Sequence, residues 1–264
     1  MQITAHTPTV LGVDMEMLSA ALDSSHINTI VTAYWRVSVV EVTASTQSDL
    51  VALVEQGKGK SGDVIAAEFQ SAGRGRLARS FEAAPGTALL FSLYIQPKRS
   101  RDDWGWLPLI AGVSVAQVLG DFDAQIKWPN DVLINGKKVS GLIAEVVGDG
   151  VVIGIGINAA MNTSELPVPT ATSLSIEGAH NRTRNQLLGE LLNIFEVNFA
   201  AWELGSDEIQ TKYQDLSATI GREVRVEYPG DRSDIGIAMS ISNSGELVLD
   251  SGVHVHAGDI IHLR

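Results

Sequence analysis

The stretch KWPNDVLINGKKVSGLIAE, residues 127–145, predicts a β-hairpin around which the fold is built. Asn135-Gly136 is the strongest short hairpin signal, because both residue types accept the positive φ angles of a tight turn. Pro129 fixes its own φ and favours an extended Trp128, so the chain that enters the hairpin is held stiffly. We therefore expect two paired strands that are joined at Asn135-Gly136.

The polar residues of this hairpin indicate a functional site. Asn130, Asp131, Lys138 and Gly141 are expected near one mouth of the hairpin. A lysine beside an amide, a carboxylate and an exposed glycine suits an anionic substrate that a metal ion assists. The alternative is a solvated hairpin with two ordinary surface lysines, but few structural needs require KWPND joined to K-x-x-G.

Composition limits the class of protein. The chain has 264 residues, 45% of them hydrophobic and 19% charged, which allows one large domain or one large and one small domain. The absence of cysteine excludes disulfides, thiolate catalysis and cysteine-based zinc sites. A net charge of −12 argues against wide contact with nucleic-acid phosphates. We see neither an apolar run of membrane-spanning length nor a signal peptide, and we expect a cytoplasmic protein that binds no membrane.

Helical and strand patterns alternate along the chain. Helices are expected at residues 14–22, with Asp14 as the N-cap, and at residues 49–54, 104–119, 183–204 and 207–216. Strands are expected, in addition to the hairpin, at residues 29–43, 63–69, 87–95, 124–128 and 151–157. From residue 221 onward, short strands alternate with turns, which predicts a small β-barrel of about 45 residues.

A second informative stretch, QSAGRGRLARSF, covers residues 70–81. Its glycines let the chain close over a phosphate, and its three arginines offer forked donors to phosphate oxygens. We interpret it as an anion clamp that is mobile until ligand binds, since like charges repel when nothing lies between them. The alternative is a surface loop with solvated arginines.

Three glycine patterns, one of them within residues 70–81, resemble nucleotide-binding motifs without matching them. Residues 57–62 lack the first glycine of a phosphate loop, and residues 73–78 and 154–158 lack the helix that a dinucleotide fingerprint requires. Alternating glycines in GIGIN, residues 154–158, indicate close approach of a flat ligand or a neighbouring strand. Asn158 at its end either reads a base or a metal-bound phosphate, or satisfies a local turn.

A few further residues have two interpretations. Ser45 or Thr46 either caps the helix that follows or contacts a ligand. Trp104 and Trp106 are interpreted as packing residues. His254 and His256 share a strand face, and without a third ligand type nearby we interpret them as strand-surface residues rather than metal ligands.

The quoted motifs resemble those of the biotin protein ligase family over about residues 40–264. GRGRLAR resembles the family's biotinyl-adenylate loop, KWPNDVLINGKKVSG its second signature and GIGIN its third. The resemblance implies an α/β (α+β) fold: a catalytic domain, residues 1–218, with a mixed β-sheet packed by helices, and a C-terminal SH3-like β-barrel, residues 219–264.

The resemblance also implies a reaction in two halves. The biotin carboxylate attacks the α-phosphate of MgATP to give biotinyl-5′-AMP and pyrophosphate, and a lysine of a carrier domain then attacks the mixed anhydride. Biotin, ATP and Mg²⁺ are thus the expected ligands, and a biotin carboxyl carrier domain of a carboxylase, such as acetyl-CoA carboxylase, is the expected partner. Only 44 residues precede Ser45, too few for a winged helix-turn-helix, so we expect no DNA binding. We expect a monomer or a weak homodimer.

The resemblance assigns roles to individual residues. Catalysis is assigned to Lys138, Arg76 and Arg74. Biotin binding is assigned to Ser45, Thr46, Gln47, Gln70, Arg74, Gly75, Arg76, Lys138 and Gly141. ATP binding is assigned to Arg76, Arg79, Lys127, Asn130, Asp131, Lys138 and Asn158, with Asp131 also as the Mg²⁺ ligand. Trp128 is interpreted as structural.

Two positions depart from the family pattern. Gln47 stands where the family usually has asparagine, which alters the hydrogen bond expected there. Phe81 stands where the family usually has tryptophan, which keeps an aromatic face and loses the indole N–H.

Three other functions are compatible with parts of the sequence. A lipoate ligase or octanoyltransferase belongs to the same superfamily, but its glycine-arginine loop differs from GRGRLAR. A biotin-sensing transcription factor conflicts with the charge of −12. A catalytically dead biotin-binding module conflicts with the presence of Lys138 and all three loop arginines.

Overall fold

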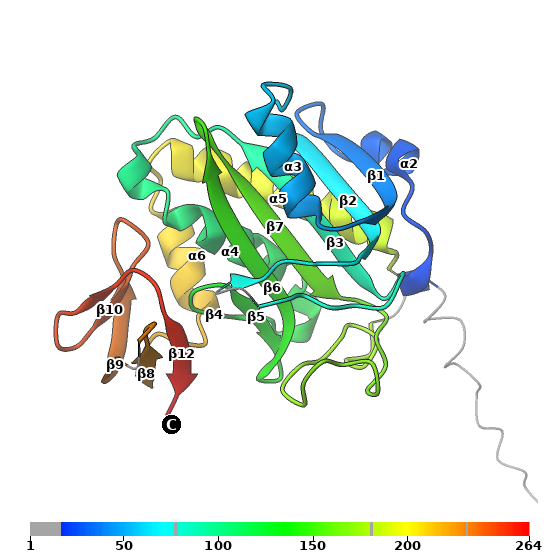
Figure 1. The fold of residues 1–264 in the computed structure, drawn as a ribbon. Coiled ribbons are helices and arrows are strands. Elements are labelled where there is room, and N and C mark those ends of the chain that lie inside the picture. Colours follow the sequence, from blue (N-terminus) through cyan, green and yellow to red (C-terminus); the bar gives the residue numbers. More distant parts are fainter. Residues whose placement is uncertain (1–16, 77–78, 180–181, 231, 264) are drawn as a thin grey trace, which may run out of the picture.

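The structure is a computed structural model that describes residues 17–76, 79–179, 182–230 and 232–263 (Figure 1). Its larger sheet has seven strands in the spatial order β1-β2-β3-β7-β6-β5-β4. These strands are β1 (Arg36–Thr43), β2 (Asp63–Gln70), β3 (Ala88–Ile95), β4 (Gln125–Lys127), β5 (Asp131–Ile134), β6 (Lys137–Val147) and β7 (Gly150–Asn158). β1 and β2 are parallel and are connected through α3 (Thr46–Glu55), whereas the other neighbouring pairs are antiparallel. The expected mixed sheet is therefore confirmed.

Helices cover the two faces of this sheet unequally. The main core lies between the sheet and the helices α2 (Ser24–Ile30), α4 (Trp106–Val118), α5 (Arg184–Glu203) and α6 (Glu208–Leu216). Among the helices in the described part of the chain, only α3 packs on the opposite face, against β2, β3 and β7 (Figure 1). Two 3₁₀ turns, η2 (Arg101–Asp103) and η3 (Gly120–Phe122), flank α4. The part of this face that α3 does not cover holds the cavity of the candidate site.

The C-terminal strands form a second, antiparallel sheet in the order β11-β10-β9-β8-β12. Its strands are β8 (Glu223–Glu227), β9 (Ser233–Ile241), β10 (Leu247–Leu249), β11 (His254–Val255) and β12 (Asp259–His262). This confirms the predicted small all-β C-terminal unit. The predicted domain boundary after residue 218 lies in the connection between α6 and β8, and it stays a prediction.

Buried tryptophans join the two sheets. The indole nitrogen of Trp106 donates to the carbonyl oxygen of Ser242 at 3.0 Å, and that of Trp128 donates to Gly245 at 3.4 Å. The backbone of Gly105 lies so close to the connection between β9 and β10 that a Cβ on Gly105 would be 2.0 Å from the Ser244 carbonyl oxygen. Trp128 is buried, as expected for a structural residue.

The predicted strand 29–43 is wrong in its first half. Thr29 and Ile30 belong to α2, because Asp23 caps that helix by accepting hydrogen bonds from the backbone N–H of Ser25 at 2.8 Å and His26 at 3.2 Å. The cap outweighs the β-branched residues that suggested a strand.

The predicted helix 14–22 is only partly tested. Helix is present at residues 17–19 and has ended by residue 20, while Asp14 lies outside the described residues. Elsewhere the expected helices and strands are present, with ends that shift by a few residues. Within the described ranges, no helix is long and apolar enough to span a membrane.

Candidate active site

A cavity of about 380 Å³ opens on the uncovered face, next to the start of α3. Its floor consists of two rows of paired residues on β3, β7 and β6, Leu90–Gly156–Gly141 and Ser92–Gly154–Ile143. A Cβ on Gly156 would be 2.6 Å from Phe81 Cζ, and a Cβ on Gly154 would be 2.7 Å from Gln47 Oε1. The glycines of GIGIN thus admit side chains directly against the sheet, and the same flatness would admit a ring system.

A β-bulge brings Lys138 to the cavity. β5 pairs Val132 with Ser140 and then Leu133 with Lys138, so Val139 is an extra residue on β6. In a regular strand, residues three apart point to opposite faces, but the extra residue re-aims the side chain that precedes it. As a result a Cβ on Gly141 would be 3.0 Å from Lys138 Nζ. The K-x-x-G spacing therefore produces a lysine and a glycine on one face.

Buried polar side chains close the deep end of the cavity. The backbone N–H and hydroxyl of Thr46 donate to Gln70 Oε1 at 2.7 and 3.0 Å. The Ser92 hydroxyl lies 2.9 Å from that of Thr46 and donates to Gln47 Oε1 at 3.2 Å. Gln47 Nε2 donates to the Val152 carbonyl oxygen at 3.1 Å. These fixed donors and acceptors can form hydrogen bonds with a polar group of a ligand that is inserted between them.

Ser45 caps α3. Its side chain accepts from the backbone N–H of Ser48 at 3.5 Å, and the same buried residue lines the cavity. The cap interpretation is therefore confirmed, and ligand contact by Ser45 stays a prediction.

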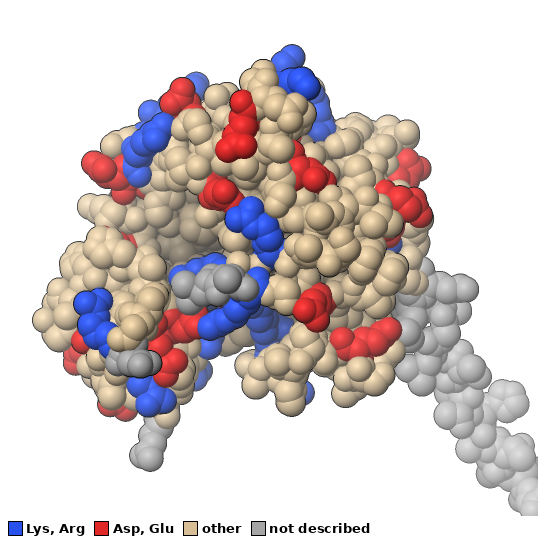
Figure 2. Space-filling model, viewed as in Figure 1, with Lys and Arg blue, Asp and Glu red and all other residues tan. Residues whose placement is uncertain are grey.

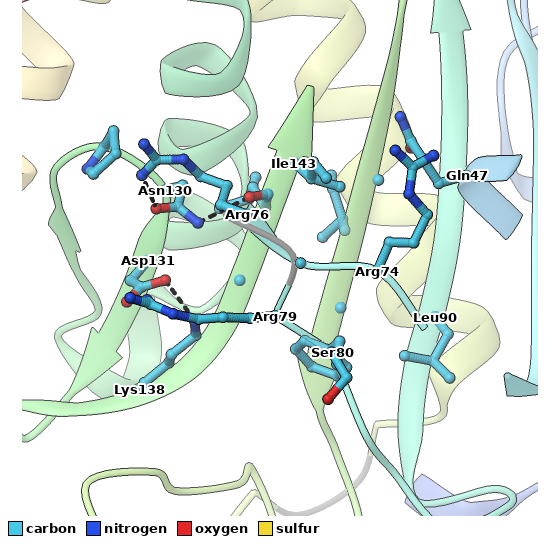
Figure 3. Close-up of a pocket in the computed structure, with 18 of the residues that line it drawn as sticks. Gln47, Arg74, Arg76, Arg79, Ser80, Leu90, Asn130, Asp131, Lys138 and Ile143 are labelled. Carbon is cyan, nitrogen blue, oxygen red and sulfur yellow. Dashed lines mark hydrogen bonds and ion pairs between the residues drawn. The ribbon is translucent and has the colours of Figure 1, made fainter. Parts of the chain in front are cut away.

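The arginine loop, which we define as residues 73–76 and 79–81, crosses over the floor (Figure 3). Backbone hydrogen bonds from Gly75 N–H to Arg79 O at 2.7 Å and from Phe81 N–H to Gly73 O at 2.9 Å close it into a narrow turn. Leu77 and Ala78 lie outside the described residues. The mobility expected of this loop stays a prediction.

Lys138 and Arg74 each form an ion pair within the protein. Lys138 Nζ lies 2.6 Å from Asp131 Oδ1, and Arg74 Nη2 lies 3.0 Å from Glu145 Oε2. Figure 2 shows Lys and Arg side chains gathered around a hollow in the middle of this face, with Asp and Glu beside them. A local concentration of positive charge in an acidic protein favours a compact anion such as a polyphosphate.

Arg76 is the most enclosed of the loop arginines. Its Nη1 donates to Asn130 Oδ1 at 2.9 Å, and Asn130 in turn donates to the Leu142 carbonyl oxygen at 2.9 Å (Figure 3). Burial lowers the pKa of Arg76, and the nearby Asp259 and Asp131 carboxylates oppose that shift. A partly desolvated guanidinium binds an incoming anion more strongly than one in water.

All but one of the predicted site residues line the cavity: Ser45, Thr46, Gln47, Gln70, Arg74, Gly75, Arg76, Arg79, Lys127, Asn130, Asp131, Lys138 and Gly141. The other, Asn158, is buried and donates from Nδ2 to the Thr172 carbonyl oxygen at 2.9 Å. Thr172 lies 14 residues further along the chain, so the contact ties the end of β7 to a later loop rather than to a local turn. The role of Asn158 towards ATP stays a prediction.

Several lining residues were missed by sequence reasoning. Ser92 is a single hydroxyl within an apolar strand, and Glu227 and Asp259 belong to the C-terminal sheet. For Ser92, its pairing with Gly154 was the available signal, but it needed the strand register. Nothing in the sequence around Glu227 or Asp259 indicated that these two acidic residues would line the cavity.

Comparisons with known proteins agree with this geometry. A family model described as the Biotin/lipoate A/B protein ligase family matches residues 39–162, and one for the biotin protein ligase C terminal domain matches residues 219–263. A biotin–[acetyl-CoA-carboxylase] ligase of Mycobacterium tuberculosis is 38% identical over 87% of this chain and 90% of its own length. A ligase of the same name from Paracoccus denitrificans is 30% identical over 78% of this chain and 92% of its own.

The fold also matches solved structures of biotin protein ligases. Biotin protein ligase from Aquifex aeolicus, in complex with biotin and ATP, superposes with a TM-score of 0.72 at 28% identity, covering 86% of this chain and 98% of that one. The chain belongs to the biotin protein ligase family, and it is an enzyme of the ligase class.

Proposed function

We propose that this member of the family uses MgATP to join biotin to a lysine of a carrier domain. In the first half-reaction a biotin carboxylate oxygen attacks the α-phosphorus of ATP, the bond to the bridging oxygen breaks and pyrophosphate leaves. In the second, the amine of the carrier lysine attacks the acyl carbon, AMP leaves and the nitrogen loses a proton.

One observation carries this proposal: Lys138 and the loop arginines converge above a glycine floor whose far end is a polar network. The nucleophile of the first step is the substrate's own carboxylate, so the protein has to bring two anions together and neutralise them. Among the described residues that line the cavity there is no histidine or cysteine, and this mechanism needs none.

Biotin is proposed to lie with its ring system on the floor. The ureido group of biotin has donors and an acceptor, which suits Ser45, Thr46, Gln47 and Gln70 at the deep end. The apolar ring atoms would lie beside the Phe81 ring, which itself packs against Gly156. The carboxylate would then emerge towards Lys138.

ATP is proposed to bind on the Lys138 side of the cavity. Lys138 contacts both the biotin carboxylate and the α-phosphate, and Arg74 and Arg76 cover the acyl-adenylate. The remaining phosphate contacts are proposed for Arg79, Lys127 and Asn130, with Asn158 nearby. Each charged donor aimed at the developing charge contributes about 10²- to 10³-fold to the rate.

The cavity fits Mg²⁺ as a companion of ATP. Asp131 presents a carboxylate to the cavity, and Mg²⁺ is usually held by one or two carboxylates together with substrate phosphates. Across the described ranges no three acidic, histidine or cysteine side chains form a metal cluster, so phosphate oxygens have to complete the shell. When bound, Mg²⁺ neutralises charge on the phosphates.

The acceptor is proposed to be the biotin carboxyl carrier domain of a carboxylase, with acetyl-CoA carboxylase the leading candidate because the relatives from M. tuberculosis and P. denitrificans carry it in their names. We further propose a cytoplasmic monomer or weak homodimer that binds no DNA, with a catalytic domain over residues 1–218 and a C-terminal domain over residues 219–264.

ATP–pyrophosphate exchange, run separately with biotin and with lipoate and without a carrier, tests the proposal. Exchange that depends on biotin is the expected result. Exchange with lipoate would replace the substrate, and no exchange with either by folded protein supplied with Mg²⁺ would refute the mechanism. Transfer is then checked by mass spectrometry of a carrier domain, with a variant lacking its acceptor lysine as the control.

A further inference from the structure

The C-terminal sheet contributes directly to the wall of the cavity. Asp259, Ile260 and Ile261 of β12 line it, although they are far from the arginine loop in sequence. The Gly258 carbonyl oxygen lies 3.5 Å from both terminal nitrogens of Arg76. The loop is therefore held between the two sheets rather than by the larger sheet alone.

One contact across the seam between the two sheets joins Arg79 to Asp259. Nη2 of Arg79 donates to Oδ2 of Asp259 in an ion pair. The Arg79 side chain is 65% exposed and the Asp259 side chain 28% exposed, so the carboxylate is the more enclosed member of the pair. Asp259 is held on a paired strand, directly opposite Glu227.

A guanidinium can serve two anions at once. It has five N–H donors in a planar fork, and the contact with Asp259 uses one nitrogen. The remaining donors stay available to a phosphate oxygen, while the carboxylate fixes the plane of the fork. An arginine that is already oriented loses less conformational freedom when the phosphate arrives.

We infer that Asp259 is a positioning residue that presents Arg79 to the phosphates of ATP. The inference rests on the proposed function, because that function supplies the nucleotide. It gives the C-terminal sheet a specific part in the first half-reaction. The alternative is that Asp259 competes with phosphate for Arg79. Removing the carboxylate would then lower the KM for ATP, whereas loss of a positioning residue would raise it.

The test is the KM for ATP in biotin-dependent pyrophosphate exchange. Asp259→Ala should raise it about fivefold, the upper end of the effect of an exposed ion pair. The KM for biotin should not change, and Asp259→Glu should restore most of the loss. A lower KM for ATP would show competition, and an unchanged KM would show no role; both overturn the inference.

A double-mutant cycle separates positioning from general structural damage. If Asp259 acts through Arg79, then Arg79→Ala and the double variant should have the same KM for ATP. A purely structural role of Asp259 would add its effect to that of Arg79→Ala, would lower the melting temperature and would change both KM values. Any of these results would overturn the inference.

Asp149→Ala is the matched control. It removes one carboxylate that is paired with an arginine, Arg101, at 3.1 Å, away from the cavity. It should leave both KM values unchanged. A rise in the KM for ATP equal to that of Asp259→Ala would mean that net charge alone is responsible, which overturns the inference.

Calorimetric titration with ATP keeps the two proposals distinguishable. If the unmodified protein shows no biotin-dependent exchange but binds ATP, and Asp259→Ala weakens that binding, the proposed function fails and the positioning role stands. If exchange proceeds but Asp259→Ala matches the unmodified protein in both assays, the function stands and the positioning role fails.

Discussion

Lys138 Nζ and Asp131 Oδ1 lie 2.6 Å apart across the β5–β6 hairpin, and both face the cavity (Figure 3). The pair holds the ammonium group at the place where the proposed function brings the biotin carboxylate and the α-phosphate together. The contact depends on the bulge at Val139, since a regular strand would turn Lys138 to the other face.

Lys138→Ala should abolish biotinyl-adenylate formation, lowering the exchange rate by about 100-fold or more, because the charge between carboxylate and phosphate is lost. The measurement is pyrophosphate exchange together with far-ultraviolet circular dichroism. Lys137→Ala, which alters the exposed neighbouring lysine, is the control and should be silent. An unfolded Lys138→Ala protein would show instead that the lysine is structural.

Gly156→Ala should raise the KM for biotin by about tenfold or more, since overfilling a packed site costs about 1–3 kcal/mol. The added methyl would lie 2.6 Å from Phe81 Cζ, so the ring would have to move into the space proposed for biotin. Gly120→Ala is the control, because nothing lies within 4 Å of a Cβ there. Equal biotin KM values for the two variants would contradict a tightly packed floor.

Arg184→Met should lower the free energy of unfolding by about 3–5 kcal/mol, because it leaves the carboxylate of Glu68, which is only 15% exposed, without its cation. Arg184 is fully buried, and its Nη2 lies 2.6 Å from Glu68 Oε2. Urea unfolding provides the measurement. Arg36→Met removes a pair with Asp63 in which the arginine is 47% exposed, and should cost no more than about 1 kcal/mol. Equal losses would refute the importance of burial.

His262 should make the protein sensitive to mild acid. Burial, together with Lys127 and Arg222, lowers the pKa of His262 to about 4. Its Nε2 lies 3.1 Å from the Thr219 hydroxyl, which accepts a hydrogen bond from the backbone N–H of Trp128 and can donate its own proton only to a neutral ring. The unfolded chain takes up this proton near pH 6.5 and the folded chain only near pH 4, so stability is lost as pH falls through that interval.

His262→Gln tests this sign, because glutamine keeps an acceptor for Thr219 and cannot titrate. The melting temperature of the variant should fall less steeply than that of the unmodified protein between pH 6.5 and 4. Parallel melting curves over that range would show that His262 does not control the acid response.

Local chemistry made the hairpin predictable. Asn135 and Gly136 have φ angles of 51° and 74°, as the turn signal requires. The bulge that follows was not predictable, because Val139 resembles any strand residue. Its position is determined by pairing with β5 and by the burial of Val139 in the core.

The loop arginines of the site were predictable, and the acidic partners of Arg74 and Arg79 were not. Arg74 and Arg79 are prominent among glycines, but Glu145 and Asp259 come from distant segments that the fold brings to the loop. The strand expected at Thr29 failed for a related reason. A cap at Asp23 and contacts of Asn28 with Val37 decide the local structure there, and the residue-by-residue pattern did not include them.

The two indoles at the seam between the sheets give the protein its own optical reporter. Trp106 and Trp128 are buried and donate to carbonyl groups of the C-terminal sheet, while the other three tryptophans, Trp35, Trp104 and Trp202, are buried within the larger unit. If the small sheet moves away, the indoles of Trp106 and Trp128 become exposed to water and their emission shifts to longer wavelength. The emission of the other three tryptophans stays unchanged. Intrinsic fluorescence can therefore follow the opening and closing of the seam without any attached dye.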